Sequence, residues 1–453
     1  MDQGTPAFVA ARGCRIDSRS AFSASSLRAL RPGSLVLLAG WILFQTSGCS
    51  VLSPVTSMLR AKREVYHFDH PFGAESPAFR RSLDTFGAAV VPGNQVEILN
   101  NGDEIFPAML GAIRDARRTV NMESYIFKDD HTGHLFAAAL MDAVRRGVEV
   151  RLLVDGAGGR AGSLFEPMKK AGVKAYIYHP LRLWSIYRFS HRTHRKILVI
   201  DGRLCFTGGV GIEDRWQGNA RNPKEWRDVQ VRATGPVAAQ MQAVFAEDWT
   251  YTNGEILAGD QFYPEIAPAG AILAMAIKSS PGDSSSLAEM LYYMMIQSAE
   301  KSLYIQNAYF LPDAHIRAAL IAAKKRGVDV RIMVPGKHID VKPVRLASRL
   351  HYDDMLEAGI KFYEYADTMM HSKTAVVDGI FSLVGSINFD TRSMRINAEE
   401  SLGFYDRGFA GRLQAVFEND MKHCEEVTYE KWAKRGPAQR FFELVSWMFE
   451  PLY

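Results

Sequence analysis

The sequence predicts an α/β protein built from two similar lobes that pack as a pseudo-dimer. Amphipathic helical segments alternate with short apolar segments rich in β-branched residues, which is typical of α/β folds. This series occurs twice within the 453 residues, and corresponding positions lie 177 to 187 residues apart. Because that distance is the size of a domain and exceeds any solenoid repeat, we expect each copy to form a lobe of its own.

Paired segments from the two copies, taken in chain order, predict the helices and strands of each lobe. Residues 107–127 and 287–310 each combine an amphipathic helix with the strand that follows it. Residues 145–154 and 325–334 each start with a basic pair and a glycine, which fits a helix C-cap, and continue as a buried strand. A third pair follows in the same order, in segments that begin Ala-Gly-Val-Lys and Ala-Gly-Ile-Lys.

These patterns divide the chain into six expected segments. They are a signal peptide or membrane anchor at 1–48, a linker at 49–95, a first lobe at 96–255, a second linker at 256–275, a second lobe at 276–430 and an apolar C-terminal tail at 431–453.

The N-terminal segment predicts a membrane tether. The apolar run at 35–44 is too short to span a bilayer, but it fits the hydrophobic region of a signal peptide behind Arg28 and Arg31. Small residues precede Cys49, which resembles the bacterial lipobox, where the cysteine is lipidated. An uncleaved short anchor and a mis-assigned start are the alternatives. A lipid chain with one further contact would anchor the body stably.

Composition excludes several classes of protein. A hydrophobic share of 47% excludes a disordered or collagen-like chain. The N-terminal 48 residues carry +3 of the net charge of +4, so the body is nearly neutral, and we expect no nucleic-acid partner. Four cysteines in so long a chain make no disulfide scaffold.

A fourth repeated pattern carries the chemistry. The pattern H-x-K-x-x-x-x-D occurs as His194, Lys196 and Asp201, and again as His371, Lys373 and Asp378. Small residues follow both copies, with Gly209 and Ser386 in corresponding places. Side chains two positions apart on a strand point to the same face, so each histidine and its lysine should share one site.

Two histidines and two lysines suit phosphate chemistry. One imidazole can attack phosphorus, and the other can protonate the leaving alkoxide and then deprotonate the next acceptor. The lysine ammonium groups stabilise the negative charge on the phosphate oxygens, so no metal and no cofactor is expected. We expect Asp201 and Asp378 to orient and charge the histidines.

These motifs resemble the phospholipase D superfamily and, within it, the bacterial cardiolipin synthases. The resemblance covers about residues 96 to 430 and includes these strings: Gly385-Ser-Ile-Asn388-Phe-Asp390-Thr-Arg392-Ser393, Asn397-Ala-Glu399 and Trp226-Arg-Asp228. It implies two lobes, each a mixed sheet flanked by helices, around one shared active site. It also implies a phosphohistidine intermediate and phospholipid substrates at a membrane, in a monomer with an internal pseudo-dimer.

The resemblance also assigns roles to individual residues. It implies that Ser386 and Asn388 help to bind phosphate, that Glu399 supports a histidine, and that His194, in the N-terminal copy, is the nucleophile. Gly209 belongs to the same set of substrate-binding positions. The first copy has Gly211 where the family often has asparagine, so its half-site has fewer phosphate donors.

The function predicted from the sequence is a phosphatidyltransferase that makes cardiolipin from phosphatidylglycerol and a second phospholipid, in the bacterial cell envelope. The alternative is a hydrolase on the same scaffold, a phospholipase D or, less favoured by the charge of the body, a nuclease. A binding protein with an inactive site is disfavoured, because both copies keep the histidine and the lysine.

Three further patterns in the sequence each have more than one interpretation. Two H-x-x-H pairs, at His131 and His191, lack further ligands at suitable spacing, so a zinc site is not expected. Residues 181–189 mix aromatics with arginines and are interpreted as a loop that dips into the membrane interface, with an ordinary packed loop as the alternative. The C-terminal run from Arg440 groups its apolar residues on one helical face, which either lies on the bilayer or packs on the second lobe.

Overall fold

The computed structural model describes residues 66–68, 71–159, 161–180, 191–280 and 287–448. The expected leader, Cys49 and the aromatic and basic segment at 181–189 lie outside these ranges. Among the helices that are described, none combines the length and the apolar character needed to cross a membrane.

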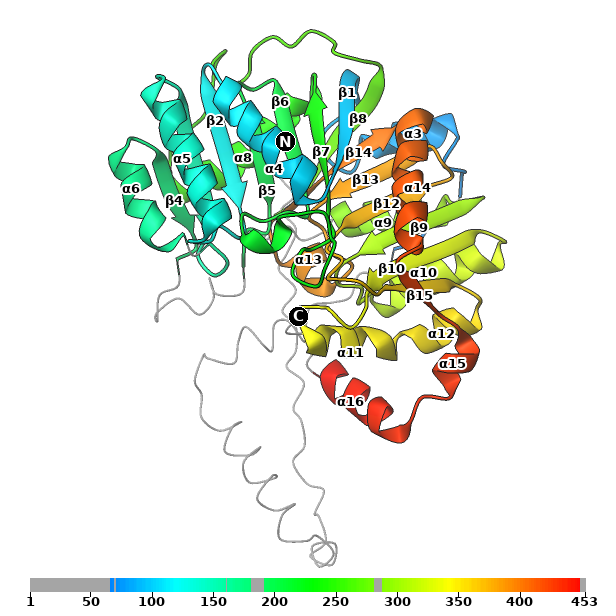
Figure 1. The fold of residues 1–453 in the computed structure, drawn as a ribbon. Coiled ribbons are helices and arrows are strands. Elements are labelled where there is room, and N and C mark those ends of the chain that lie inside the picture. The colour runs from blue at the N-terminus through cyan, green and yellow to red at the C-terminus, as the bar shows by residue number, and fades with distance from the viewer. Residues whose placement is uncertain (1–65, 69–70, 160, 181–190, 281–286, 449–453) are drawn as a thin grey trace, which may run out of the picture. The chain divides into compact units, whose positions relative to one another are not determined.

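One mixed sheet of 15 strands runs through both lobes of the described chain (Figure 1). Its order is β15-β11-β10-β9-β12-β13-β14-β8-β1-β7-β6-β5-β2-β3-β4. The strands of the first lobe are β1 (Val91–Asn100), β2 (Thr119–Ser124), β3 (Glu149–Asp155), β4 (Lys174–Tyr178), β5 (Lys196–Ile200), β6 (Leu204–Gly208) and β7 (Val229–Thr234). Those of the second are β8 (Ile272–Ser279), β9 (Ser302–Asn307), β10 (Asp329–Pro335), β11 (Lys361–Tyr365), β12 (Lys373–Val377), β13 (Phe381–Gly385), β14 (Glu399–Tyr405) and β15 (Cys424–Val427).

The strand order confirms the pseudo-twofold arrangement. Read outward from the central pair β8 and β1, the two halves place their strands in the same sequence, and the second half adds β15 at its outer edge. In each half the strands β2, β3 and β4, or β9, β10 and β11, are parallel, and the other pairings are antiparallel. The central antiparallel pair joins the lobes edge to edge, with Val91 opposite Ala274.

Helices cover both faces of this sheet. The first lobe contains α4 (Asn101–Asp115), α5 (His131–Arg145), the 3₁₀ turns η2 (Gly162–Leu164) and η3 (Asp214–Trp216), α6 (Phe165–Lys170) and α8 (Val237–Asn253). The second contains α9 (Leu287–Gln297), α10 (Ala314–Lys325), α11 (Lys342–Leu350), α12 (Tyr352–Glu357), α13 (Thr391–Arg395), α14 (Arg407–Met421), α15 (Tyr429–Ala433) and α16 (Pro437–Trp447). The expected helix and strand of 107–127 and of 287–310 are present as α4 with β2 and as α9 with β9.

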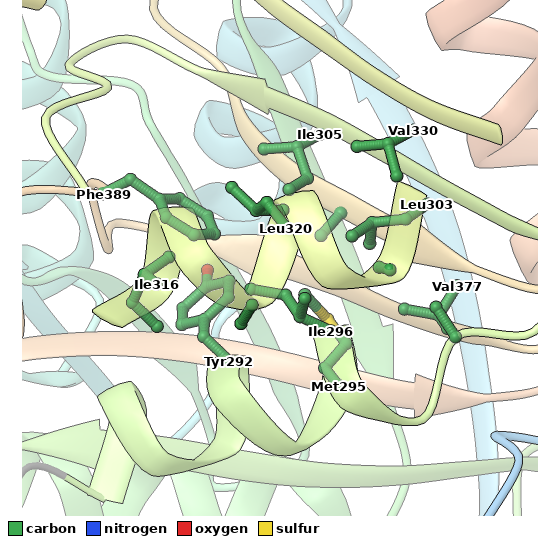
Figure 2. Packing of buried hydrophobic residues seen from close by; sticks show 14 of the residues in the cluster. Tyr292, Met295, Ile296, Leu303, Ile305, Ile316, Leu320, Val330, Val377 and Phe389 are labelled. Carbon is green, nitrogen blue, oxygen red and sulfur yellow. The ribbon is translucent and has the colours of Figure 1, made fainter. Parts of the chain in front are cut away.

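The core of the second lobe lies between α9, α10 and the sheet. Figure 2 shows Tyr292, Met295 and Ile296 of α9 packed with Ile316 and Leu320 of α10. All five side chains are buried, against strand residues from β9, β10 and β12. This packing holds rigid the strands that carry the second motif.

Three elements lie or begin within the segments expected to be linkers, namely α3, β1, which begins at Val91, and β8. Helix α3 (Pro77–Leu83) begins after Ser76, whose hydroxyl caps it, and its Phe79 and Leu83 are buried in the core of the second lobe. Strand β8 starts at Ile272, inside the second expected linker. Both segments therefore contribute to the folded body and to its central strands.

Candidate active site

Each motif histidine lies on a segment that pairs with the opposite lobe. The backbone N–H of His194 donates to the carbonyl of Ala398 at 2.8 Å, and that of His371 donates to Arg227 at 2.7 Å. Single β-bridges at Thr193 with Ala398 and at Arg227 with Met370 fix the same two crossings. The two crossings therefore bring the N-terminal ends of β5 and β12 to the boundary between the lobes.

The crossings give each histidine a carboxylate from the other lobe. Nδ1 of His194 lies 2.8 Å from Oε2 of Glu399, at the start of β14. Nδ1 of His371 lies 3.0 Å from Oδ2 of Asp228, just before β7. All four side chains are buried. Because Nδ1 of each ring is engaged by a carboxylate, Nε2 is the nitrogen available for chemistry, and in His371 this atom lies 3.0 Å from Nζ of Lys373.

The structure corrects the expectation that Asp201 and Asp378 orient the histidines. Each lies beyond the far end of its strand, in an Asp-Gly turn with positive φ values of 53° and 49°. Five residues of extended chain place Asp201 about 16 Å from Lys196. Both carboxylates accept three consecutive backbone N–H groups at the start of the neighbouring strand: Arg117, Arg118 and Thr119 for Asp201, and Glu300, Lys301 and Ser302 for Asp378.

The two lysines lie beside their histidines, as the spacing predicts. Nζ of Lys196 donates to the carbonyl of His194 at 2.5 Å, and Nζ of Lys373 donates to that of His371 at 2.6 Å. Burial lowers the pKa of both ammonium groups, and for Lys373 the charge of Lys196 adds to the effect, so that its pKa falls to about 7. An anionic phosphate in the site would favour the charged form again.

Two serine hydroxyls hold Glu399. Ser386 donates to Oε2 and Ser393 to Oε1, each at 2.5 Å. Burial raises the pKa of Glu399 to about 7, although Lys196 and these hydroxyls oppose the rise. Ser386 is fully buried beneath Glu399 rather than on the cavity wall, which differs from the expected contact with phosphate.

Asp228 has a different environment. Its Oδ2 accepts from the indole N–H of Trp216 at 2.9 Å as well as from His371. Burial opposes its ionisation, but the hydrogen bond and charge of His371 and the charge of Lys373 prevail and keep the pKa of Asp228 below its ordinary value. A Cβ on Gly209 would come within 2.5 Å of this carboxylate, so Gly209 leaves room for Asp228.

The two histidines also differ in the balance of effects on their pKa values. Burial, reinforced by the charges of Lys196 and Lys373, holds the pKa of His194 well below its ordinary value. Burial and Lys373 also lower the pKa of His371, but the hydrogen bond to Asp228 acts against them. His194 is therefore neutral at pH 7 and able to act as a nucleophile.

Both histidines open into one cavity of about 350 Å³. Its other polar or aromatic lining residues are Tyr125, Arg192, Lys196, Arg215, Trp226, Tyr309, Asp340, Asn388, Asp390, Arg392, Ser393 and Asn397. Oδ1 of Asn388 is buried there without a hydrogen-bond partner among the described residues, which leaves this end of the amide available for a ligand. Tyr125 packs edge-on against His194, with ring centroids 5.0 Å apart.

Sequence reasoning missed three residues at this site. Asp228 was noted in the string Trp226-Arg-Asp228 but received no role, and Trp216 and Ser393 received none. A signal was present, because 226–228 and 397–399 occupy corresponding places at the entry to β7 and β14. Within the described residues, no group of three or more metal-ligating side chains is arranged to hold a metal ion. The expectation that the reaction needs no metal stays a prediction.

The fold and the doubled motif define a protein of the phospholipase D type, with two copies of the domain in one chain. The family model "Cardiolipin synthase, PLD-like domain" matches residues 109–249 and 292–421. A probable cardiolipin synthase of Bacillus subtilis is 35% identical over 360 residues, which span 79% of this chain and 72% of the relative. Cardiolipin synthase A of Pseudomonas putida is 34% identical over 84% of this chain and 79% of its own length.

A solved structure agrees on the fold. The phosphatidylserine synthase of Haemophilus influenzae superposes with a TM-score of 0.61 over 78% of this chain and 92% of that chain, at 15% identity. The present chain belongs to the cardiolipin synthase family, whose members are phosphatidyltransferases of the phospholipase D superfamily.

Proposed function

We propose that the protein makes cardiolipin by moving a phosphatidyl group from one phospholipid to the glycerol headgroup of phosphatidylglycerol. The observation that carries this proposal is a single cavity that holds two histidines, each hydrogen-bonded to a carboxylate of the opposite lobe. Such a cavity can supply a nucleophile and an acid–base group on opposite sides of one phosphorus atom.

In the first step Nε2 of His194 attacks the phosphorus of the donor lipid. Asp228 and the bound anionic phosphate favour the protonated form of His371. A P–N bond forms, the P–O bond to the headgroup breaks, and His371 gives its proton to the leaving alkoxide oxygen. Lys196 and Lys373 stabilise the charge on the non-bridging oxygens. The amide of Asn388, one N–H of which donates to Ser393 at 3.3 Å, donates its second N–H to one of these oxygens. Glu399 accepts the Nδ1–H of His194 and so stabilises the positive charge that the ring gains.

In the second step His371, now neutral, removes the proton from a headgroup hydroxyl of the acceptor phosphatidylglycerol. The acceptor oxygen attacks phosphorus, the P–N bond to His194 breaks, and both imidazoles return to their starting states. Asp228 stays ionised throughout and supports the proton that His371 carries between the steps. Water in place of the acceptor would give phosphatidic acid.

The same proposal places the protein at a membrane of the bacterial cell envelope, where both lipids reside. The apolar run at 35–44 supports such a location, and lipidation of Cys49 is one form of it. The two lobes supply both half-sites, which supports a functional monomer. Nothing in the charge of the body favours a nucleic-acid substrate.

Product analysis with vesicles of phosphatidylglycerol tests the proposal. Cardiolipin and free glycerol should form in equal amounts, and cardiolipin should be absent with His371→Ala. Turnover should continue in EDTA, because the lysines supply the positive charge. Phosphatidic acid as the main product, even at high acceptor concentration, would instead identify a hydrolase.

A further inference from the structure

Helix α16 exposes most of its apolar side chains and buries an acidic one. Its apolar side chains Phe441, Leu444 and Met448 are 60%, 48% and 69% exposed, whereas Glu443 is fully buried. Phe442 and Trp447 are also exposed, at 58% and 43%. Positions 441, 444 and 448 follow the helical period, so they form one stripe on the face opposite Glu443. A surface helix of a soluble domain normally has the reverse orientation.

Ion pairs fix this orientation. Glu443 accepts from Nε of Arg435 at 3.0 Å and from the amide of Gln439 at 3.0 Å, and Nε of Arg349 on α11 lies 3.5 Å away. Turning the helix to bury the apolar stripe would remove Glu443 from both guanidinium groups, each of which would keep one other carboxylate, Asp353 for Arg435 and Glu364 for Arg349. The exposed stripe is therefore held outward by the fold.

Helix α16 lies one helix away from the active-site cavity. Helix α16 packs along α11 (Figure 1). The residue before α11, Val341, lines the cavity and is 38% exposed, so it stands at the cavity rim, and Val344 of the helix lines the same wall. One side of α11 thus borders the cavity while α16 covers another part of it. An apolar surface of this kind next to a site is typical of an interaction surface.

The charges around the stripe favour an anionic partner. In the segment from Thr428 to Met448, Lys431, Lys434 and Arg440 are exposed, and one acidic residue, Glu430, is exposed. Lys342 at the start of α11 is also exposed. Basic residues that flank an apolar helical face, together with tryptophan at its edge, match the chemistry of an anionic phospholipid surface.

We propose that the outward face of α16 docks on an anionic phospholipid bilayer, with Phe441, Leu444 and Met448 inserted among the acyl chains and the basic residues at the headgroups. Docking there would hold the cavity, one helix away, close to the lipid from which substrates enter. The choice of lipid as partner rests on the proposed function, whereas the orientation of the helix does not.

Binding is tested with the full chain carrying Cys49→Ser, so that no lipid at that residue holds it to the vesicle. Co-flotation uses vesicles of phosphatidylglycerol and phosphatidylcholine in about equal parts. Replacing Phe441, Leu444 and Met448 by Ser, Ser and Gln should weaken binding about tenfold or more. The matched control replaces three exposed apolar residues outside α16, Leu135, Ile177 and Ile256, by Ser and should bind as the parent does.

Brominated lipids report insertion of the helix itself. Trp447 fluorescence, taken as the difference between the parent and Trp447→Phe, should be quenched by bromine in the acyl chains. Trp216, Trp249 and Trp432 are buried and should report no insertion. Equal flotation of both triple variants, or an unquenched Trp447, would overturn the proposal.

Activity separates this inference from the proposed function. On a short-chain phosphatidylglycerol below its micelle concentration, the α16 triple variant should keep the parent rate, and on vesicles it should lose about tenfold. Loss on both substrates would mean that the face is part of the fold, and inactivity of the parent on both would refute the proposed function alone. A parent dimer without lipid, dissociated by the triple substitution, would assign the face to a second copy of the chain.

Discussion

The two half-sites have the same plan and different chemistry. In the first, His194 faces Glu399, whose pKa is about 7 and whose oxygens are held by two serine hydroxyls. In the second, His371 faces Asp228, which is held by an indole N–H and keeps a pKa below its ordinary value. The difference teaches that a repeated motif fixes the positions of two groups, while the surrounding lobe decides the role of each.

One pair of positions explains much of the difference. Gly209 and Ser386 correspond in the two motifs, and each lies against the carboxylate of its half-site. Ser386 reaches Glu399 with its hydroxyl, but a side chain at 209 would collide with Asp228. The first half-site therefore has a hydrogen-bond donor, the Ser386 hydroxyl, at the position where the second half-site has room only for a glycine.

Replacing either histidine is expected to have the largest effect on activity. His194→Ala and His371→Ala should each lower transfer between natural lipids by about 10³-fold or more. A phosphodiester with a nitrophenolate leaving group needs no proton from His371, so His371→Ala should recover release of nitrophenolate whereas His194→Ala should not. Rapid quench and peptide mapping should find the adduct on His194, and an adduct on His371 would reverse the two roles.

The carboxylates should differ in their dependence on pH. Asp228→Asn should lower kcat about 10³-fold at every pH, because it removes a charge that is always present. Glu399 takes up a proton below about pH 7, so Glu399→Gln should cost little at pH 6 and about 10²-fold at pH 8. Parallel pH profiles of kcat for the two variants would contradict the assigned difference in ionisation.

Lys373 should determine the pH above which kcat/KM of the free enzyme falls. Its pKa of about 7 means that it loses its charge as the pH rises, so kcat/KM for a soluble short-chain substrate should fall above about pH 7. Lys373→Arg keeps a permanent charge and should move this fall to higher pH, whatever its absolute rate. An unchanged alkaline limit in Lys373→Arg would assign the titration to another group.

The smallest effect on catalysis is expected from replacing Asp201 or Asp378 in the two Asp-Gly turns. Asp201→Ala and Asp378→Ala each remove an acceptor of three backbone N–H groups and should lower stability by about 3 kcal/mol, seen as a lower Tm. Asparagine tolerates the positive φ and keeps one acceptor oxygen, so the Asn variants should lose about 1 kcal/mol. The folded Asn variants should retain kcat within about threefold, since neither carboxylate faces the cavity.

The sequence predicted what depends on local periodicity. Alternation along a strand placed His194 with Lys196 and His371 with Lys373, the repeat predicted two lobes, and the family resemblance implied one site shared between them. It did not predict the partners that depend on how the lobes dock. Glu399 and Asp228 reach the histidines only because β-bridges cross the boundary between the lobes, and a single motif contains no information about that crossing. The role of Asp201 was misjudged because four intervening residues are close in sequence but span the length of β5.

The sheet that continues from β1 into β8 has a consequence for how such a protein can change. In a symmetric dimer of one lobe, every substitution would appear in both half-sites at once, so Ser386 could not be gained without forcing a side chain against Asp228. Joining the lobes in one chain removes that constraint, and each half-site can acquire neighbours that the other would not tolerate. Specialisation of one histidine for attack and of the other for proton transfer is open to the joined chain and closed to a perfectly symmetric pair.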